Sequence, residues 1–101
     1  MNKDDFHVNS RYTVTLKDSE GKPRPSKFYV LQKFANDMVV RLTYREGTLQ
    51  KIGYEDVLRI VDHKEVPKQD QFALPDALLT EGFWKDRTEM QHYSSAPHMG
   101  K

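Results

Sequence analysis

The feature that most constrains this fold is a series of short runs between residues 28 and 61 in which apolar and polar side chains alternate. Turn-forming residues separate the runs at 35–37 and at 46–47. Alternation with a period of two, rich in β-branched and aromatic residues, is typical of half-buried strands. A tight segment at 53–56 is too short for an α-helix and predicts a single 3₁₀ turn before the last run, at 57–61. These residues predict a small, strongly curved antiparallel barrel.

The connection at 35–37 sets the register of the first of these hairpins. A three-residue connection keeps the apolar side chains on one face by pairing Phe34 with Met38, Val30 with Leu42, and Phe28 with Tyr44. A two-residue connection would mix the faces, and a slip of one residue turns a whole apolar set toward solvent. We therefore expect the three-residue form, with Asn36 or Asp37 in a left-handed conformation.

Residues 6–17 also alternate, with an apolar face made by Phe6, Val8, Tyr12, Val14 and Leu16. A straight strand of that length would span roughly 40 Å, so a bend or bulge is expected near Asn9 and Ser10. The following stretch, 18–26, reads as a long loop that two prolines stiffen. Its basic residues, with Lys27 beyond them, suit either a rigid connector, which we favour, or a contact with an acidic partner.

Five short strands with a long first connection and a 3₁₀ turn before the last strand resemble the SH3-like small barrels over residues 12–61. The functions known for that architecture do not transfer. Its proline-rich-peptide binders carry a tryptophan early in the chain, whereas Trp84 lies beyond the predicted barrel. Chromatin readers need an aromatic cage, and the pairing above places Tyr12 and Tyr44 in the core. The resemblance implies a fold that binds a ligand, and it names no ligand.

The densest apolar patch outside the barrel comprises Phe72, Leu74, Leu78, Leu79, Phe83 and Trp84. Pro75, Asp76 and Gly82 predict a helix of about two turns over 75–81. A helix this short is unstable alone, so the patch either folds back and caps an open end of the barrel, which we favour, or docks on a partner protein. The chain then divides into a barrel at 6–66, a linker with the apolar segment at 67–84, and a disordered tail at 85–101.

Composition excludes several classes of site. The chain has 101 residues, a net charge of +1 and no cysteine, which rules out disulfides and thiolate zinc sites. No apolar stretch is long enough to span a membrane, and the polar N-terminus is unlike a secretory signal, so a cytoplasmic protein is expected. The four histidines lack partners with ligand spacing, and no nucleophile stands beside a base. We expect no enzyme activity, metal or cofactor.

The predicted outer face of the barrel offers a second hypothesis. Its cations surround an aromatic residue, as in small barrels that bind RNA or single-stranded DNA; the residues are Arg11, Tyr29, Lys33, Arg41, Arg45 and Lys51. An ordinary solvated face has the same composition. The sequence therefore predicts a non-catalytic module that binds a protein through the 72–84 segment or the barrel surface. Nucleic-acid binding is the alternative, and unpaired edge strands also permit self-association.

Overall fold

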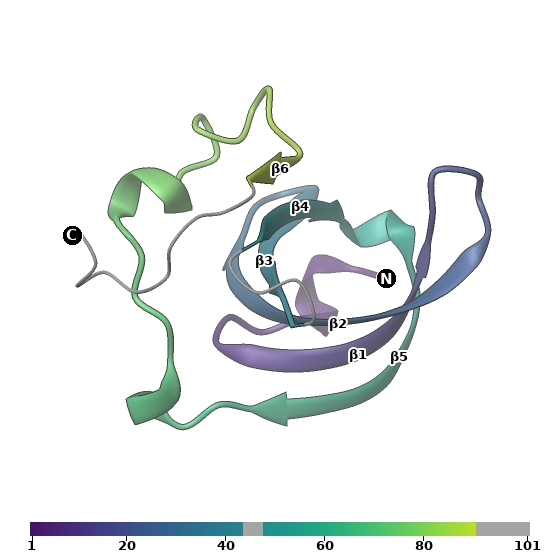
Figure 1. Cartoon of the computed structure of the whole chain (residues 1–101), viewed down its shortest axis with the longest axis horizontal. Helices are drawn as coiled ribbons and strands as arrows, with labels where there is room; N and C mark the ends of the chain where they lie inside the picture. Colours follow the sequence, from purple (N-terminus) through teal and green to yellow (C-terminus); the bar gives the residue numbers. More distant parts are fainter. Residues whose placement is uncertain (44–47, 91–101) are drawn as a thin grey trace.

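The computed structural model describes residues 1–43 and 48–90 and consists mainly of one antiparallel sheet (Figure 1). Its six strands lie in the order β5-β1-β2-β3-β4-β6. Their bounds are β1 Ser10–Lys17, β2 Pro23–Lys33, β3 Asp37–Leu42, β4 Leu49–Gly53, β5 Val57–Glu65 and β6 Glu89–Met90. The helical segments of the described residues are short 3₁₀ turns, namely η1 Lys3–Asp5, η2 Tyr54–Asp56, η3 Lys68–Asp70 and η4 Asp76–Leu79. The 3₁₀ turn predicted at 53–56 is confirmed.

The predicted closure of the sheet into a barrel is wrong. β5 lies at one end of the sheet and is hydrogen-bonded to β1. In a closed barrel the outer edge of β4 would pair with β5. Here that edge pairs with β6, and the Lys51 amide donates a 2.8 Å hydrogen bond to the Thr88 carbonyl oxygen. The sheet is strongly curved but open, and η2 joins β4 to β5 (Figure 1).

The first apolar cluster lies on the side of the sheet that curls around the N-terminal segment (Figure 1). Phe6 is fully buried there, and the Lys33 ammonium fixes it by donating a 2.7 Å hydrogen bond to its carbonyl oxygen. The chain then reverses at Asn9, whose φ is 66°, which confirms the bend predicted near Asn9 and Ser10. Because of this reversal Val8 does not share the face of Phe6, and it is exposed. The buried members of the cluster are Phe6, Tyr12, Val14, Phe28, Val30, Met38, Val40, Leu42, Ile52, Tyr54 and Val57.

A second apolar cluster joins the sheet to the C-terminal segment. Its buried members are Tyr29, Leu31, Phe34, Val39, Leu49, Val66, Leu78 and Trp84. The helix predicted over 75–81 is wrong, because only the single 3₁₀ turn η4 forms, and Pro75 precedes it. Disorder was expected from residue 85, yet β6 pairs with Leu49 and Gln50 of β4. Residues 91–101 lie outside the described part.

The pairing of β2 with β3 is shifted by two residues from the predicted register at the end of the hairpin away from its turn. Phe28 lies opposite Leu42 and Val30 opposite Val40. A shift of two preserves the face of each side chain, so Phe28, Val30, Met38 and Leu42 do share the first cluster as predicted.

An irregularity between Val30 and Gln32 accounts for the rest of the difference. One extra residue in a strand reverses the side to which the following side chains point. Phe34 therefore lies in the second cluster and not on the face predicted for it. The left-handed conformation expected at Asn36 or Asp37 is absent, since Asn9 is the one non-glycine residue with a positive φ among the described residues. The predicted place of Tyr44 lies outside the described residues.

The first hairpin is tighter than expected. β2 begins at Pro23, so the loop predicted over 18–26 shortens to 18–22. The Asp18 carboxylate holds this turn together: it accepts bonds of 2.8 and 2.9 Å from the amides of Glu20 and Lys22 and a 3.0 Å bond from Arg24 Nε. Hydrogen bonds to the ionised carboxylate, with the Lys22 amide first, lower the pKa of Asp18. These hydrogen bonds to the Asp18 side chain stabilise a turn that is shorter than the predicted loop.

Candidate functional site

Two irregularities in β5 distinguish it from the other strands. Along the β1 ladder, Asp62 and Ile60 face consecutive residues of β1, as do Arg59 and Val57. Leu58 and Val61 are each passed over, as happens at a β-bulge. Both of these side chains are exposed, at 47% and 53%. The bulges therefore leave two large apolar side chains uncovered, three residues apart, on a strand at the end of the sheet.

Three other residues of β5 contact members of the first cluster. Val57 is buried and Ile60 packs against the first cluster. The His63 ring stacks on the Tyr12 ring, with centroids 4.5 Å apart and planes 5° apart. β5 therefore contacts the first cluster at residues three apart, although the His63 side chain itself is exposed. Leu58 and Val61 lie between these contacts.

A small cleft lies on the surface formed by β5, β1 and β2. Its volume is about 160 Å³. The residues that line it are Arg11, Tyr12, Thr13, Lys27, Thr43, Asp62 and Lys64. Three of the seven are cations and one is an acid. We refer to this hollow as the basic cleft.

The residues predicted to bind nucleic acid do not form a common exposed face. Tyr29 is fully buried, with the Phe72 ring edge-on at 4.9 Å. The Arg41 guanidinium lies 4.5 Å over Phe72. Two lysines are occupied by backbone oxygens, Lys33 at Phe6 and Lys51 at Trp84, the latter at 2.6 Å. The expected exposure of Tyr29 is wrong, because the C-terminal segment covers it. Arg45 lies outside the described residues.

The apolar residues of the 72–84 segment pack against the same chain. Leu78 and Trp84 are buried in the second cluster, and Phe72, Leu74, Leu79 and Phe83 are partly buried against it. Trp84 Nε1 donates a 2.7 Å hydrogen bond to the Leu78 carbonyl oxygen. The segment therefore packs within the chain, as the sequence favoured, but on one face of the sheet and the β4 edge and not on an open end of a barrel.

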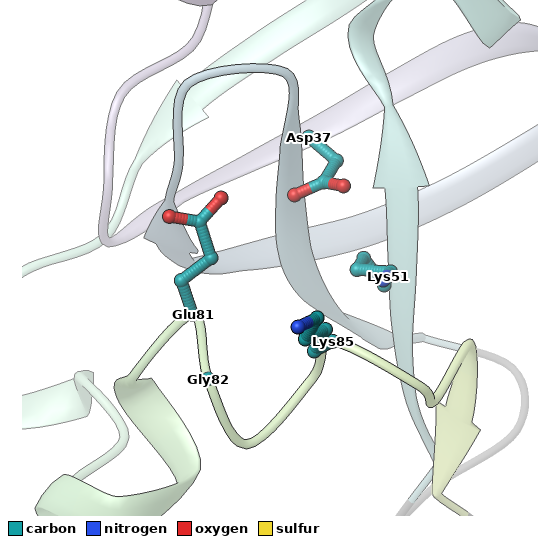
Figure 2. A pocket seen from close by; sticks show the side chains of 5 residues that line it. All are labelled: Asp37, Lys51, Glu81, Gly82 and Lys85. Atoms are coloured by element: carbon teal, nitrogen blue, oxygen red, sulfur yellow. The ribbon is translucent and has the colours of Figure 1, made fainter.

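A second cleft separates the C-terminal segment from the β3–β4 edge (Figure 2). Its volume is about 430 Å³, and it is lined by Asp37, Lys51, Glu81, Gly82 and Lys85. Figure 2 shows the Asp37 and Glu81 carboxylates at one side of the cleft and the two lysines at the other. The charges sum to zero, and Lys51 already binds the Trp84 oxygen. This junction fastens the segment to the sheet, and no ligand chemistry follows from it.

His7 and His63 form a contact that the sequence did not indicate. Their rings stack with centroids 5.9 Å apart, because the reversal at Asn9 returns the N-terminal segment to the end of β5. Within residues 1–43 and 48–90, no group of three or more histidines and acids is placed to hold a metal ion. The same residues include no helix with the length and apolarity needed to cross a membrane.

Comparison of the chain with protein-family models, curated proteins and solved structures finds no match. The sequence did contain one signal for the β5 surface that strand periodicity overlooked: residues 57–61 consist of two adjacent apolar pairs flanking Arg59. Paired apolar residues break a period of two, and each pair marks a bulge.

Proposed function

We propose that the protein is a non-catalytic binding module that recognises an acidic segment of a partner protein, with apolar residues in it, on the outer surface of β5. The observation that carries this proposal is the pair of bulges that exposes Leu58 and Val61 on β5, the strand whose Asp62 and Lys64 line the basic cleft. Covering each of these side chains on binding contributes at most about 1.5–3 kcal/mol. A partner therefore gains from a site that the fold leaves uncovered.

The partner is proposed to pack against side chains and not to add a strand to the sheet. β5 is an end strand, and end strands are the usual templates for strand addition. Bulges and charged side chains are, however, the features that block such pairing. β5 carries both, with Arg59 and Asp62 beside the bulged residues. The bulges and charged side chains also argue against self-association through this edge.

Charge favours an acidic partner. Cations outnumber acids in the cleft that β5 helps to form: it has Arg11, Lys27 and Lys64 against Asp62, and Arg59 on β5 is also exposed. Complementary charge steers association and sets specificity. An acidic segment with two apolar residues matches both properties of the surface.

The architecture supports a binding role by likeness only. Five strands, with η2 between the fourth and the fifth, are the features for which the sequence resembles SH3-like small barrels. We infer an open variant of that architecture, in which the C-terminal segment occupies the edge that closure would use. Folds of this kind host many functions, so the site and not the fold supports the proposal.

Capture of partners from source lysate tests the proposal with three baits. The first is the full chain, the second carries Leu58→Asp and Val61→Asp, and the third carries Val8→Asp. Val8 is an exposed apolar residue outside β5, so it controls for a charge placed on any uncovered valine. We expect a protein retained by the first and third baits and lost by the second, both with and without nuclease.

Three results would contradict the proposal: a retained protein that the double substitution does not affect, equal loss with Val8→Asp, or capture that nuclease removes. Nuclease sensitivity would favour the nucleic-acid alternative. In that case the affinity for a single strand held by four phosphate contacts would fall with salt at a logarithmic slope of about −3.

A further inference from the structure

The basic cleft is built from ladder positions that place like charges together. Arg11 on β1 lies directly opposite Lys64 on β5, so the two side chains share a face. Like charges directly opposite each other across a ladder destabilise a sheet. Between described residues, no ion pair involves either side chain, the described pairs being Lys22–Glu20 and Arg24–Asp18. An anion between Arg11 and Lys64 would relieve this repulsion.

The neighbouring positions supply a third cation and two hydroxyl groups. Thr13 lies opposite Lys27 on β2 and opposite Asp62 on β5. The Thr43 amide donates a 3.0 Å hydrogen bond to the Lys27 carbonyl oxygen, which places Thr43 at the far wall of the cleft. Both threonine side chains line it, and a hydroxyl can donate to an anionic oxygen. Strand pairing thus brings all these donors around one hollow.

The charge of the cleft distinguishes between anions. Three cations and the Asp62 carboxylate leave a formal charge of +2. A phosphate monoester carries about −1.5 to −2 at pH 7 and has three strong acceptor oxygens. A carboxylate carries −1 and has two oxygens, so it leaves a cation and a hydroxyl unused. A hollow of about 160 Å³ accommodates one such group.

We infer that the basic cleft binds a phosphoryl group, carried by a phosphorylated side chain of the partner segment. This inference rests on the proposed function, because β5 both forms a wall of the cleft and carries Leu58 and Val61. A segment that covers Val61 reaches the strand position next to Asp62, which lines the cleft. Single-stranded nucleic acid fits less well, since it needs exposed aromatic rings for base stacking, and Tyr12 and Tyr29 on this part of the sheet are buried.

Titration of the full chain with defined probes tests the inference by amide chemical-shift mapping. The probes are N-acetylated amides of phosphoserine, phosphothreonine and phosphotyrosine, their unphosphorylated forms, the glutamate equivalent, inorganic phosphate, and a single-stranded oligonucleotide. We expect a phosphorylated amide to shift Arg11, Thr13, Lys27 and Lys64 together. Its affinity should exceed that of its unphosphorylated and glutamate forms by about tenfold or more, as charge-assisted hydrogen bonds allow.

Substitutions at the cleft sharpen the test. Lys64→Ala and Lys27→Ala should each weaken phosphoamide binding by about tenfold, and Asp62→Asn should strengthen it several-fold by removing the one opposing charge. Lys17→Ala is the matched control, since Lys17 is an exposed β1 lysine outside the cleft and should change little. Near-wild-type amide spectra establish that each variant is folded.

The possible outcomes separate the inference from the proposed function. Equal binding of the glutamate and phosphoserine amides, binding of inorganic phosphate alone, or an oligonucleotide that binds more tightly than any phosphoamide would each overturn the inference. If the phosphoamides fail while capture still depends on Leu58 and Val61, the proposed function stands without it. If they bind at the cleft and capture ignores Leu58 and Val61, the proposed function fails instead.

Discussion

The indole Nε1–H of Trp84 donates a 2.7 Å hydrogen bond to the carbonyl oxygen of Leu78, and both side chains are buried against the sheet. The bond closes the C-terminal segment on itself while its apolar side chains cover Tyr29 and Leu49. A segment without a regular helix is held in this way by one buried polar contact and by packing. Its order depends on tertiary contacts more than on local propensity.

Trp84→Ala should therefore destabilise the whole protein. Truncating a fully buried tryptophan typically costs about 3–5 kcal/mol, and the Leu78 carbonyl oxygen would also lose its donor. Trp84→Phe keeps part of the volume and should cost less. Denaturant unfolding measures both, with Leu58→Ala as an exposed control expected to stay within about 0.5 kcal/mol of wild type. An unchanged midpoint for Trp84→Ala would show that the segment does not contribute to stability.

Phe6→Ala should be comparably harmful, although the residue lies close to the N-terminus. Phe6 packs edge-on against Tyr12 at 5.0 Å and stacks on Tyr54 at 6.0 Å, so its removal opens a cavity in the first cluster. We expect a loss of about 3–5 kcal/mol, measured by thermal and denaturant unfolding. Val8→Ala, two residues on and exposed, should be nearly neutral. Similar effects of the two substitutions would contradict this packing.

Asn9 should tolerate glycine better than alanine. Its φ of 66° costs an alanine about 1–2 kcal/mol, and its Oδ1 accepts a 2.6 Å hydrogen bond from the Tyr29 hydroxyl. Asn9→Gly loses only the hydrogen bond, about 1 kcal/mol, whereas Asn9→Ala loses both contributions. Unfolding free energies of the two variants provide the comparison. A glycine variant less stable than the alanine variant would rule out backbone strain as the reason for asparagine here.

Stability should fall in strongly alkaline solution because of Tyr54. Burial raises the pKa of Tyr54 to about 12, and its hydroxyl donates a 2.6 Å bond to the Phe34 carbonyl oxygen. The folded state keeps its proton while the unfolded phenol, with a pKa near 10, releases it. The contribution is complete below pH 10 and declines as pH rises toward 12.

Tyr54→Phe provides the control for this pH dependence. The variant should lose the hydrogen bond at neutral pH and show a shallower decline in unfolding free energy between pH 10 and 12. Burial also raises the pKa values of Tyr12 and Tyr29, so part of the decline should remain. Identical slopes for the variant and the wild type would contradict the assignment to Tyr54.

The sequence predicted the features that depend on local pattern. Period-two alternation located the strands, the short segment at 53–56 indicated η2, and the length of the strand at 6–17 required the bend found at Asn9. The need of the 72–84 segment for a surface predicted its packing on the sheet. Each of these predictions depends on the residues of the feature itself and on their near neighbours in the sequence.

The bulges and the double-sided burial could not be predicted in this way. Bulges in β2 and β5 depend on strand pairing across the sheet, which alternation within one strand does not show. Tyr29 was expected to be exposed because alternation placed it on the outer face. Residues more than forty positions away in the sequence, Phe72 among them, cover that face. The unbroken apolar stretch at 28–31 was the available sign, because strands buried on both faces lack alternation.

Clusters on both sides of β2 and β3 also determine which part of the molecule opens last. Val30 and Val40 lie in one cluster and Val39 in the other, so no local fluctuation can hydrate this part of the ladder without separating two cores. Amide deuterium exchange there should require global unfolding, while the outer residues of β5 exchange through smaller openings. The slowest-exchanging unit of the protein would then be the β2–β3 pair.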